Sequence, residues 1–469
     1  MKIKKMMLPL ASLAIISCLG SCGKDENPQK KIVMEAVEAA QNMTRDELMQ
    51  KAADEIQGGV FKFTGCSSRL HKAENNFKAL LATKNAACAN MTFTGDKSIP
   101  DGRIYQTLAA DIKANKTDCY DGFLLQDGYQ LQKYAIDTGY MVNYVPKEWN
   151  DDAATDKTKN KNPFSLQYNF KTWLVNDGAG DGIKTPDGKP LDNVWDFTHS
   201  RQKLACMNPN NENVNRDFLI MLTKDENCRL LKEAYDDPSN DSDIKVEDYA
   251  SYGELKKYAY AFIAGFIKRA SFAGDDGDII NPLSKKTADG SAAWIVYSKM
   301  NNIEETEDVS KKFLVSPALG KDNTDGATAT MNMKGFSGFM YKHYLMVSSI
   351  TKHPYTTCAF INYLATTSDG FKAWGKDIGD YPSMPSVDVN RRKFGHGEFV
   401  TNEKGEKTWK QDDTKENVFP VMNDPSGDWW VNTGKAIVED PEYLGSNYDD
   451  VNKFIIDVTA HKEIGRAHV

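Results

Sequence analysis

Short apolar strands alternate with amphipathic helices along the first third of the chain. Residues Val60 to Thr64 alternate like a strand, Asn90 to Thr94 form a second candidate, and Gly122 to Leu125 form an apolar third. Helical spacing falls between and after these strands, over Ala73 to Ala82, Tyr105 to Asn115 and Gln130 to Thr138. This alternation predicts an α/β domain with a mainly parallel sheet.

Capping residues mark further helices near both ends of the chain. Ile32 to Gln57 predicts a helix in which Thr44 and Glu47 have the spacing of a capping box. Pro354 to Trp374 predicts two helices, with Ser368 as the N-cap of the second. The remaining patterns are an amphipathic helix at Leu255 to Arg269, strand-like runs at Leu166 to Val175 and Trp294 to Tyr297, and a polar insertion at Arg391 to Asp428.

Composition narrows the class of protein. The 469 residues are 40% hydrophobic and 26% charged, with a mean hydropathy of -0.56. These values exclude a disordered chain and a multi-span membrane protein, and the length predicts about two or three domains. The 58 basic and 66 acidic residues are interspersed and give a net charge of -8, so no basic stripe points to nucleic acid.

The N-terminus has the pattern of an export signal. Lys2, Lys4 and Lys5 precede a short apolar run from Met6 to Ile16, which is too short to span a bilayer. Leu19-Gly20-Ser21-Cys22 follows and resembles a bacterial lipobox, with Cys22 as the lipidated residue. The alternative is an ordinary secretory signal with a chance cysteine, and Cys18 lies in a poorer second candidate box. We expect an extracytoplasmic protein, anchored in the cell envelope through Cys22.

Six of the eight cysteines remain after Cys18 and Cys22 are set aside: Cys66, Cys88, Cys119, Cys206, Cys228 and Cys358. Six cysteines allow 15 pairings, and none of them forms a C-x-x-C motif. Local pairs Cys66–Cys88 and Cys206–Cys228 are possible, and buried free thiols are an equal alternative.

Motifs of catalysis and metal binding are absent or incomplete. The chain has no H-E-x-x-H, G-x-S-x-G, Walker A or G-x-G-x-x-G sequence. Ser349 to Lys352 matches S-x-x-K but lacks its usual partner motifs. The acidic stretch from Asn176 to Gly188 has Gly188 where a calcium loop needs a bidentate glutamate. A distant pair of carboxylates for glycoside hydrolysis stays open. We expect no catalytic residue, no metal and no cofactor.

Seven segments in order resemble a known family. They are Gly65 to Arg69, Asp118 to Asp127, Gly139 to Pro146, Asn193 to Thr198, Met207 to Pro209, Gly335 to Tyr341 and Pro354 to Leu364. The last, P-Y-x-x-C-A-F-I-N-Y-L, is similar to the family's "P-x-x-A-x-x-F-I-N-Y-L". The chain thereby resembles the extracellular solute-binding lipoproteins of ABC transporters, which have the type II periplasmic-binding fold.

The resemblance implies two α/β lobes, each a mainly parallel sheet flanked by helices, joined by crossing strands. It places a signal peptide at 1–21, a tether and helix at 22–57, lobe 1 at 58–146 with 316–387, and lobe 2 at 147–315. Hinges are expected near Val145 and Val315. Residues 388–463 form an insertion and C-terminal helices, and 464–469 resemble a non-native tail.

The resemblance also implies a function and a site. A monomer without catalysis would capture a small organic solute, anionic or zwitterionic, in the cleft between the lobes and deliver it to permease subunits in the membrane. An anionic group would bind at the Ser67-Ser68-Arg69 loop, an amine at Asp127 or Asp196, and the rings of Trp195 and Trp294 would stack on the ligand. Each residue has a plain structural alternative, as a helix cap or as core. The chain has no adjacent tyrosine pair, which disfavours a ferric-iron site.

Two other classes of function stay open. A SusD-like surface protein that binds glycans would be nearly all helical, with internal repeats that this sequence lacks. A secreted hydrolase would need a nucleophile or a pair of carboxylates.

Overall fold

A computed structural model describes residues 27–467 apart from 97, 117, 156–161, 177–183, 284, 286–289, 300–312, 316–332, 376–378, 388–396, 402–406, 413, 415–429 and 432–435. The export signal, Cys18 and Cys22 lie outside the described residues, as do most of the acidic loop after Asn176 and much of the insertion at 391–428.

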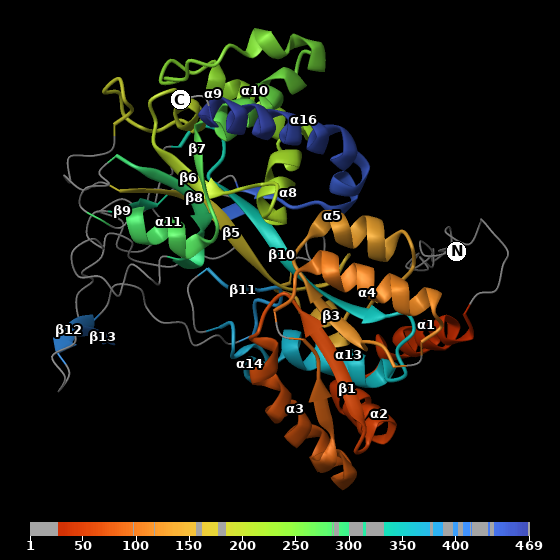
Figure 1. Cartoon of the computed structure of the whole chain (residues 1–469). Coiled ribbons are helices and arrows are strands. Elements are labelled where there is room, and N and C mark those ends of the chain that lie inside the picture. The colour runs from red at the N-terminus through yellow and green to blue at the C-terminus, as the bar shows by residue number, and fades with distance from the viewer. Residues whose placement is uncertain are drawn as a thin grey trace, which may run out of the picture.

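The part of the molecule that we call lobe 1 is built on three parallel strands. β1 (Val60–Gly65) lies between β2 (Thr92–Thr94) and β3 (Gly122–Leu125). The end of the long strand β10 (Gly338–Ser348) pairs antiparallel with β3 and then with β4 (Met141–Asn143). The strand order of lobe 1 is therefore β2-β1-β3-β10-β4, of which β1, β3 and β10 are labelled in Figure 1.

Lobe 2 repeats this order with its own strands. β6 (Leu204–Met207) lies between β7 (Ala270–Ala273) and β8 (Ala292–Val296), all parallel. The long strand β5 (Ser165–Asn176) pairs antiparallel with β8 and with β9 (Phe313–Val315). The order β7-β6-β8-β5-β9 matches lobe 1 position by position, with one long antiparallel strand fourth in each sheet. The predicted α/β fold with crossing strands is confirmed.

Helices cover both sheets (Figure 1). In lobe 1 they are α1 (Pro28–Ala40), α2 (Arg45–Ile56), α3 (Leu70–Lys84), α4 (Asp101–Lys113), α5 (Gly128–Leu131) with a π-helical turn at Gln132–Ile136, α6 (Lys147–Asp151), α13 (Pro354–Thr366) and α14 (Ser368–Phe371). In lobe 2 they are α8 (Asn213–Met221), α9 (Asp225–Tyr235), α10 (Lys256–Arg269) and α11 (Asp276–Leu283). Short 3₁₀ turns lie at Ala86–Asn90, Val194–Thr198, Val246–Tyr252 and Tyr297–Lys299.

Each lobe has its own core of packed aromatic side chains. In lobe 1, Phe360 packs edge-on against Phe61 and Phe63, with ring centroids 5.7 and 5.0 Å away. In lobe 2, Trp294 packs against Phe218 and Trp173, with centroids 4.3 and 4.6 Å away. Burial of such large rings is the main source of stability in each core.

β5 and β10 pass between the two cores. They pair antiparallel with each other over Ser165–Thr172 and Gly338–Tyr344, and every residue of both strands is buried. Trp149, Phe164 and Leu166 still belong to the lobe 1 core. The chain therefore leaves the lobe 1 core along β5 and returns to it along β10, where Leu345 belongs to the same core. The boundary expected at 146/147 and the hinges expected near Val145 and Val315 stay predictions.

The C-terminal part of the chain returns to the lobes as a short strand and a long helix. β14 (Ile437–Val438) pairs parallel with β10, and α16 (Pro441–Ala467) packs against α8 and α10 of lobe 2 and against α5 of lobe 1. Two further strands, β12 (Gly397–Thr401) and β13 (Lys407–Gln411), form a hairpin within the predicted insertion, and β11 (Tyr381–Pro382) pairs with β5.

Several local predictions are settled by the structure. The capping box of Thr44 and Glu47 is confirmed, but it begins a second helix, so the predicted helix over 32–57 is divided. Thr367 caps α14, so the assignment of Ser368 as N-cap is wrong. The six cysteines described are free thiols, and neither local pair forms a disulfide. Across the described residues, no helix is both long and apolar enough to span a bilayer.

Candidate functional site

The two lobes meet at the carboxyl ends of their parallel strands, the position at which open α/β sheets bind ligands. The loops after β1 and β3 carry Ser67 to Arg69 and Gln126-Asp127, and the loop after β6 leads into α8. Asp127 of lobe 1 receives a hydrogen bond from Asn213 and lies in the field of Arg216, both on α8 of lobe 2. We call this region, with the buried middle of β5 and β10 beneath it, the junction.

A chain of polar side chains runs along the crossing strands at the junction. Arg69 Nη1 lies 2.6 Å from Asp380 Oδ2, and Asn169 Nδ2 donates to Asp380 Oδ1 at 2.5 Å. Gln167 Nε2 lies 3.0 Å from His343 Nδ1. Burial, aided by the charge of Arg69, lowers the pKa of His343 to about 3, so the ring is neutral. The carboxylate of Asp380 thus fixes the guanidinium of Arg69 at the start of α3.

A second charged pair belongs to lobe 2. Lys171 of β5 is 2% exposed, and its Nζ lies 3.2 Å from Glu212 Oε1 at the start of α8. Burial alone would lower the pKa of Lys171, but the carboxylates of Glu212 and Asp276 outweigh it and the pKa is raised. The buried hydroxyl of Tyr341 lies in the field of Asp276, Glu212, Asp380 and Cys66, so residues of both lobes surround it.

Four buried carboxyl groups, which we call the junction carboxyl cluster, lie beside these pairs. They are Asp101 at the start of α4, Asp127 at the N-cap of α5, Asp217 on α8 and Glu439 between β14 and α16. Burial raises the pKa of Asp101 to about 7, of Asp127 to about 6 and of Glu439 to about 8. Burial, together with the charges of Asp127 and Glu439, also raises the pKa of Asp217 well above its ordinary value.

The structure places four of the seven residues chosen from the sequence at the junction. Ser67, Ser68 and Arg69 lead into α3, and the Ser67 hydroxyl accepts a hydrogen bond from the Arg69 N–H at 3.3 Å. Ser68 is exposed. Asp127 caps α5 by accepting from the Gln130 N–H at 2.8 Å.

The other three lie inside lobe 2, and the structure gives each a structural role. Trp195 is fully buried, and its Nε1 donates to the Leu231 carbonyl at 2.8 Å. Asp196 closes a capping box with Asn193 and accepts from the Asp241 N–H at 3.0 Å. Trp294 is part of the aromatic core. Because their faces are covered by protein atoms, these side chains do not meet Ser67, Arg69 and Asp127.

The site residues predicted from the sequence include none of Asp101, Lys171, Asp217, Asp380 and Glu439. Two of these residues could have been recognised in the sequence by their apolar neighbours. Lys171 interrupts the apolar run from Leu166 to Val175, and Asp217 directly precedes the apolar run that begins at Phe218. A charged residue inside a buried element is rare unless it is paired or functional. The other three stand at the ends of helices or strands, where charged residues are common and no local pattern distinguishes them.

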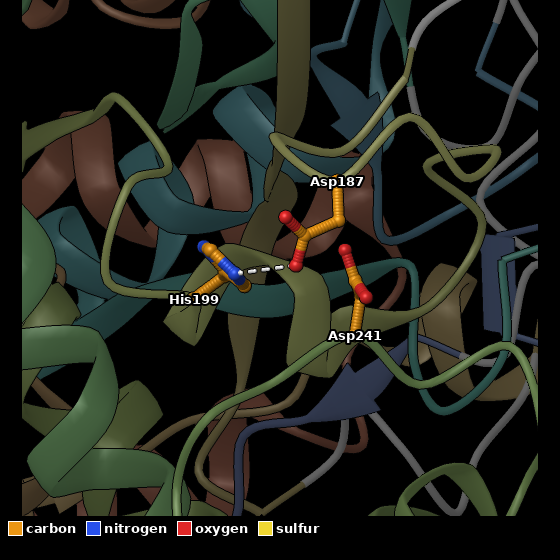
Figure 2. Close-up of side chains that lie close together, drawn as sticks. All are labelled: Asp187, His199 and Asp241. Carbon is orange, nitrogen blue, oxygen red and sulfur yellow. Dashed lines mark hydrogen bonds and ion pairs between the residues drawn. The ribbon is translucent and has the colours of Figure 1, made fainter.

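Another cluster, formed by Asp187, His199 and Asp241, lies in lobe 2 near the Val194–Thr198 turn (Figure 2). Among the residues described, it alone brings three acidic, histidine or cysteine side chains within 4.8 Å of one another. His199 Nδ1 accepts the Arg201 N–H at 3.1 Å, so the ring proton sits on Nε2, which faces Asp187 Oδ2 at 3.3 Å. A metal-binding histidine would donate from the nitrogen that here accepts.

Cations already balance the carboxylates of this cluster. Asp187 pairs with Arg201, and Lys189 Nζ lies 2.9 Å from Asp241 Oδ1. The arrangement is that of a structural ion-pair network that ties the loops around residues 187 and 241 to the turn before His199.

Comparison with known proteins gives similarities of structure only. No protein-family model matches the chain, and no curated protein matches it. The structure is similar to a ferric binding protein from Campylobacter jejuni (11% identity, TM-score 0.47, covering 85% of this chain and 99% of that one). It is also similar to iron-bound HitA from Pseudomonas aeruginosa (10% identity, TM-score 0.48, covering 85% of this chain and 99% of that one). A third similar structure is the substrate binding protein of an ABC transporter from Agrobacterium tumefaciens (11% identity, TM-score 0.42, covering 70% of this chain and 80% of that one).

Proposed function

We propose that the chain is the extracytoplasmic solute-binding component of an ABC importer, which binds a small organic ligand between its lobes without catalysis. The observation that carries this proposal is the repeated strand order of the two lobes, joined by β5 and β10, with buried charged groups of both lobes facing each other at the junction. A protein built in this way can bury a ligand by rotating one lobe against the other about two strands.

The junction supports a ligand with an anionic group at the Ser67-Ser68-Arg69 loop. Arg69 is held in place by Asp380, and the backbone turns into α3 at this point. Arginine and serine side chains are suited to hydrogen bonds with a carboxylate or a phosphoryl group. Delivery to permease subunits and a lipid anchor at Cys22 belong to the same proposal.

A ligand screen followed by scattering tests the function. A solute that binds the folded state alone stabilises it by RT ln(1 + [L]/Kd), so thermal shift against a library of metabolites should reveal a ligand. Small-angle scattering should then show compaction when that solute is added. The double variant Ser67→Ala with Ser68→Ala should bind an anionic ligand more weakly by about 1–3 kcal/mol. Stabilisation without compaction would contradict closure of the lobes.

A further inference from the structure

The junction carboxyl cluster brings together four acids that are distant in sequence. Asp101, Asp127, Asp217 and Glu439 are 5%, 1%, 1% and 2% exposed. They come from α4 and α5 of lobe 1, α8 of lobe 2 and the connection from β14 to α16. Buried carboxyl groups of this kind are rare unless other groups satisfy their oxygens.

Asp127 accepts hydrogen bonds on both oxygens, from the Gln130 N–H and from the Gln130 side chain, whereas the other three carboxyl groups are used only in part. Asp101 Oδ2 accepts the N–H groups of Gln126 and Asp127 at 2.7 and 3.0 Å. Glu439 Oε2 accepts the Lys342 N–H at 3.1 Å and the Tyr344 hydroxyl at 2.5 Å. Within the described part of the chain, no hydrogen bond reaches Asp101 Oδ1 or Glu439 Oε1, and the backbone N–H of Tyr129 is the one group that approaches Asp217 as a donor.

The unpaired hydroxyl of Tyr105 is an independent indication that a ligand binds at the junction carboxyl cluster. Tyr105 lies one helical turn after Asp101 on α4 and is 4% exposed. Its hydroxyl makes no hydrogen bond to the described residues and lies in the field of Asp101, Asp127 and Asp217. An unpaired buried polar group costs free energy, and a bound molecule that supplies donors would remove that cost.

The unused oxygens call for a positively charged donor. The cations acting on the cluster are Arg216 of α8, near Asp127 and Asp217, and Lys342 of β10, near Glu439. Two cations against four acids leave the cluster acidic. The four carboxyl groups do not form a set within metal-binding distance, unlike the cluster around His199. A dispersed set of acceptors fits an ammonium or guanidinium group, which spreads several N–H donors, better than a single metal ion.

The backbone at Gly128 lies so close to Glu439 and Leu444 that a side chain would crowd them. A Cβ on Gly128 would lie 3.0 Å from Glu439 Cδ and 3.2 Å from its unused Oε1. Glycine beside Asp127 therefore lets the carboxyl groups of Asp127 and Glu439 lie on either side of the start of α5.

We propose that the junction carboxyl cluster binds a cationic nitrogen group, an ammonium or guanidinium, of the transported solute. This inference rests on the proposed function and narrows its ligand to a cation or a zwitterion, since the Ser67-Ser68-Arg69 loop faces the same junction. In a zwitterion, the two charged groups would bind at these two places.

Such binding is coupled to protons. The cluster holds protons near neutral pH when it is empty, because burial raises the pKa values of its acids into the range of about 6 to 8. A cation binds the ionised form, so affinity should rise with pH across this range, by about tenfold per pH unit for each proton released. The other titratable groups that face the cluster are Arg216, Lys342, Tyr105, Tyr344, Tyr448 and the Cys66 thiol. Burial raises the pKa values of the three tyrosines and of the thiol, so these four groups stay uncharged across this range.

Calorimetry on the full chain tests the proposal with defined probes. 1,4-Diaminobutane, L-lysine and guanidinium are titrated at pH 5.5, 7 and 8, in buffers of different protonation enthalpy, with 1,4-butanediol and succinate as uncharged and anionic controls. At least one cationic probe should bind more tightly than 1,4-butanediol, more tightly at pH 8 than at pH 5.5, and with release of protons.

Two variants locate the site. Asp217→Asn removes a charge, and Gly128→Ala keeps every charge but presses a methyl group against Glu439 and Leu444. Each should weaken binding of the cationic probe about tenfold or more, whereas Asp225→Asn, on the exposed face of α9, should leave it unchanged. If Asp217→Asn fails to fold, the affinity of Gly128→Ala and the number of protons that the parent releases on binding still test the proposed site.

The possible failures are distinguishable. If no cationic probe binds better than 1,4-butanediol at pH 8, or if both variants bind as tightly as the parent, the cationic site is wrong. If succinate or another solute of the screen still compacts the protein in that case, the transport function stands. If a cationic probe binds at the cluster without compaction, the site stands and the proposed function falls.

Discussion

At the scale of single residues, buried acids set how stability depends on pH. The pKa of Asp101 is raised by burial to about 7, from an ordinary value of 3.8. The folded state therefore holds a proton that the unfolded state releases, and the stability this provides is lost as pH rises from about 4 through about 7. The Asp101→Asn variant should lose less stability than the parent between pH 5 and pH 8, as measured by urea unfolding without ligand.

Comparison of Asp101→Asn with the parent isolates the contribution of Asp101 to the pH dependence of stability, because the other titrating groups are the same in both proteins. Glu439 and Asp217 add losses of the same sign, and His343, whose pKa is lowered to about 3, opposes them below pH 6.5. Asp225→Asn is the matched control on an exposed site. An Asp101→Asn protein with the parent's pH slope would show that Asp101 is ionised at low pH.

Single residues also mark the limit of prediction from sequence. Asp127 is predicted because the family pattern covers the strand before it. Asp101, Asp217 and Glu439 come close to Asp127 only in the folded chain, since the four residues are spread over 338 positions of sequence, from 101 to 439. The two tryptophans chosen as stacking surfaces, Trp195 and Trp294, are core residues instead. An aromatic residue looks the same in a core and in a site until its neighbours are known.

At the scale of elements, local patterns predict well what short-range forces decide. β3 is found at its predicted residues, and α10 and β5 begin and end within one residue of theirs. The break between α1 and α2 is missed although its capping box is recognised, since both helices keep apolar spacing across it. C-terminal helices are expected within 388–463, and α16 (Pro441–Ala467) lies largely there. Which strands cross between the lobes is decided by tertiary pairing, so the crossing role of β10 is not predicted.

α16 is the element that ties the lobes together. The ring of Tyr448 stacks on Tyr129 of lobe 1 with centroids 3.2 Å apart, and its hydroxyl accepts from Arg216 Nη1 of lobe 2 at 2.6 Å. Tyr443, on the same helix, contacts Thr223 and Lys224 of lobe 2. Tyr448 therefore contributes contacts that depend on the relative position of the lobes, whereas those described for Tyr443 do not.

The Tyr448→Ala variant should shift the ligand-free protein toward a more open arrangement. The expected sign is a larger radius of gyration in small-angle scattering than that of Tyr443→Ala, which loses a ring of the same size within one lobe. Both rings are half-buried, and each variant loses ring packing and a hydrogen bond, so both should unfold more easily, by about 1–3 kcal/mol. Equal radii for the two variants would mean that α16 does not hold the lobes together.

At the scale of the whole molecule, the proposed lipid anchor at Cys22 would determine how the lobes are presented at a membrane. α1 is held to lobe 1, where Gln29 Nε2 donates to the Thr351 carbonyl at 2.6 Å. Five residues, 23–27, separate Cys22 from this helix, and a fully extended chain of that length reaches about 17 Å. A lipid on Cys22 would therefore keep lobe 1 beside the membrane and leave lobe 2 free to rotate about β5 and β10.

Removal of the proposed lipid site should free the whole protein. Cys22→Ser lacks the thiol that would carry the lipid, so we expect the protein either to leave the membrane fraction or to accumulate unprocessed, as followed by fractionation and by the mass of the N-terminal peptide. Cys18→Ser is the matched control, because it changes the poorer candidate box within the same signal and should stay with the membrane. Membrane retention of a normally processed Cys22→Ser protein would instead assign the attachment to another part of the chain, and lobe 1 would lose its fixed place at the membrane.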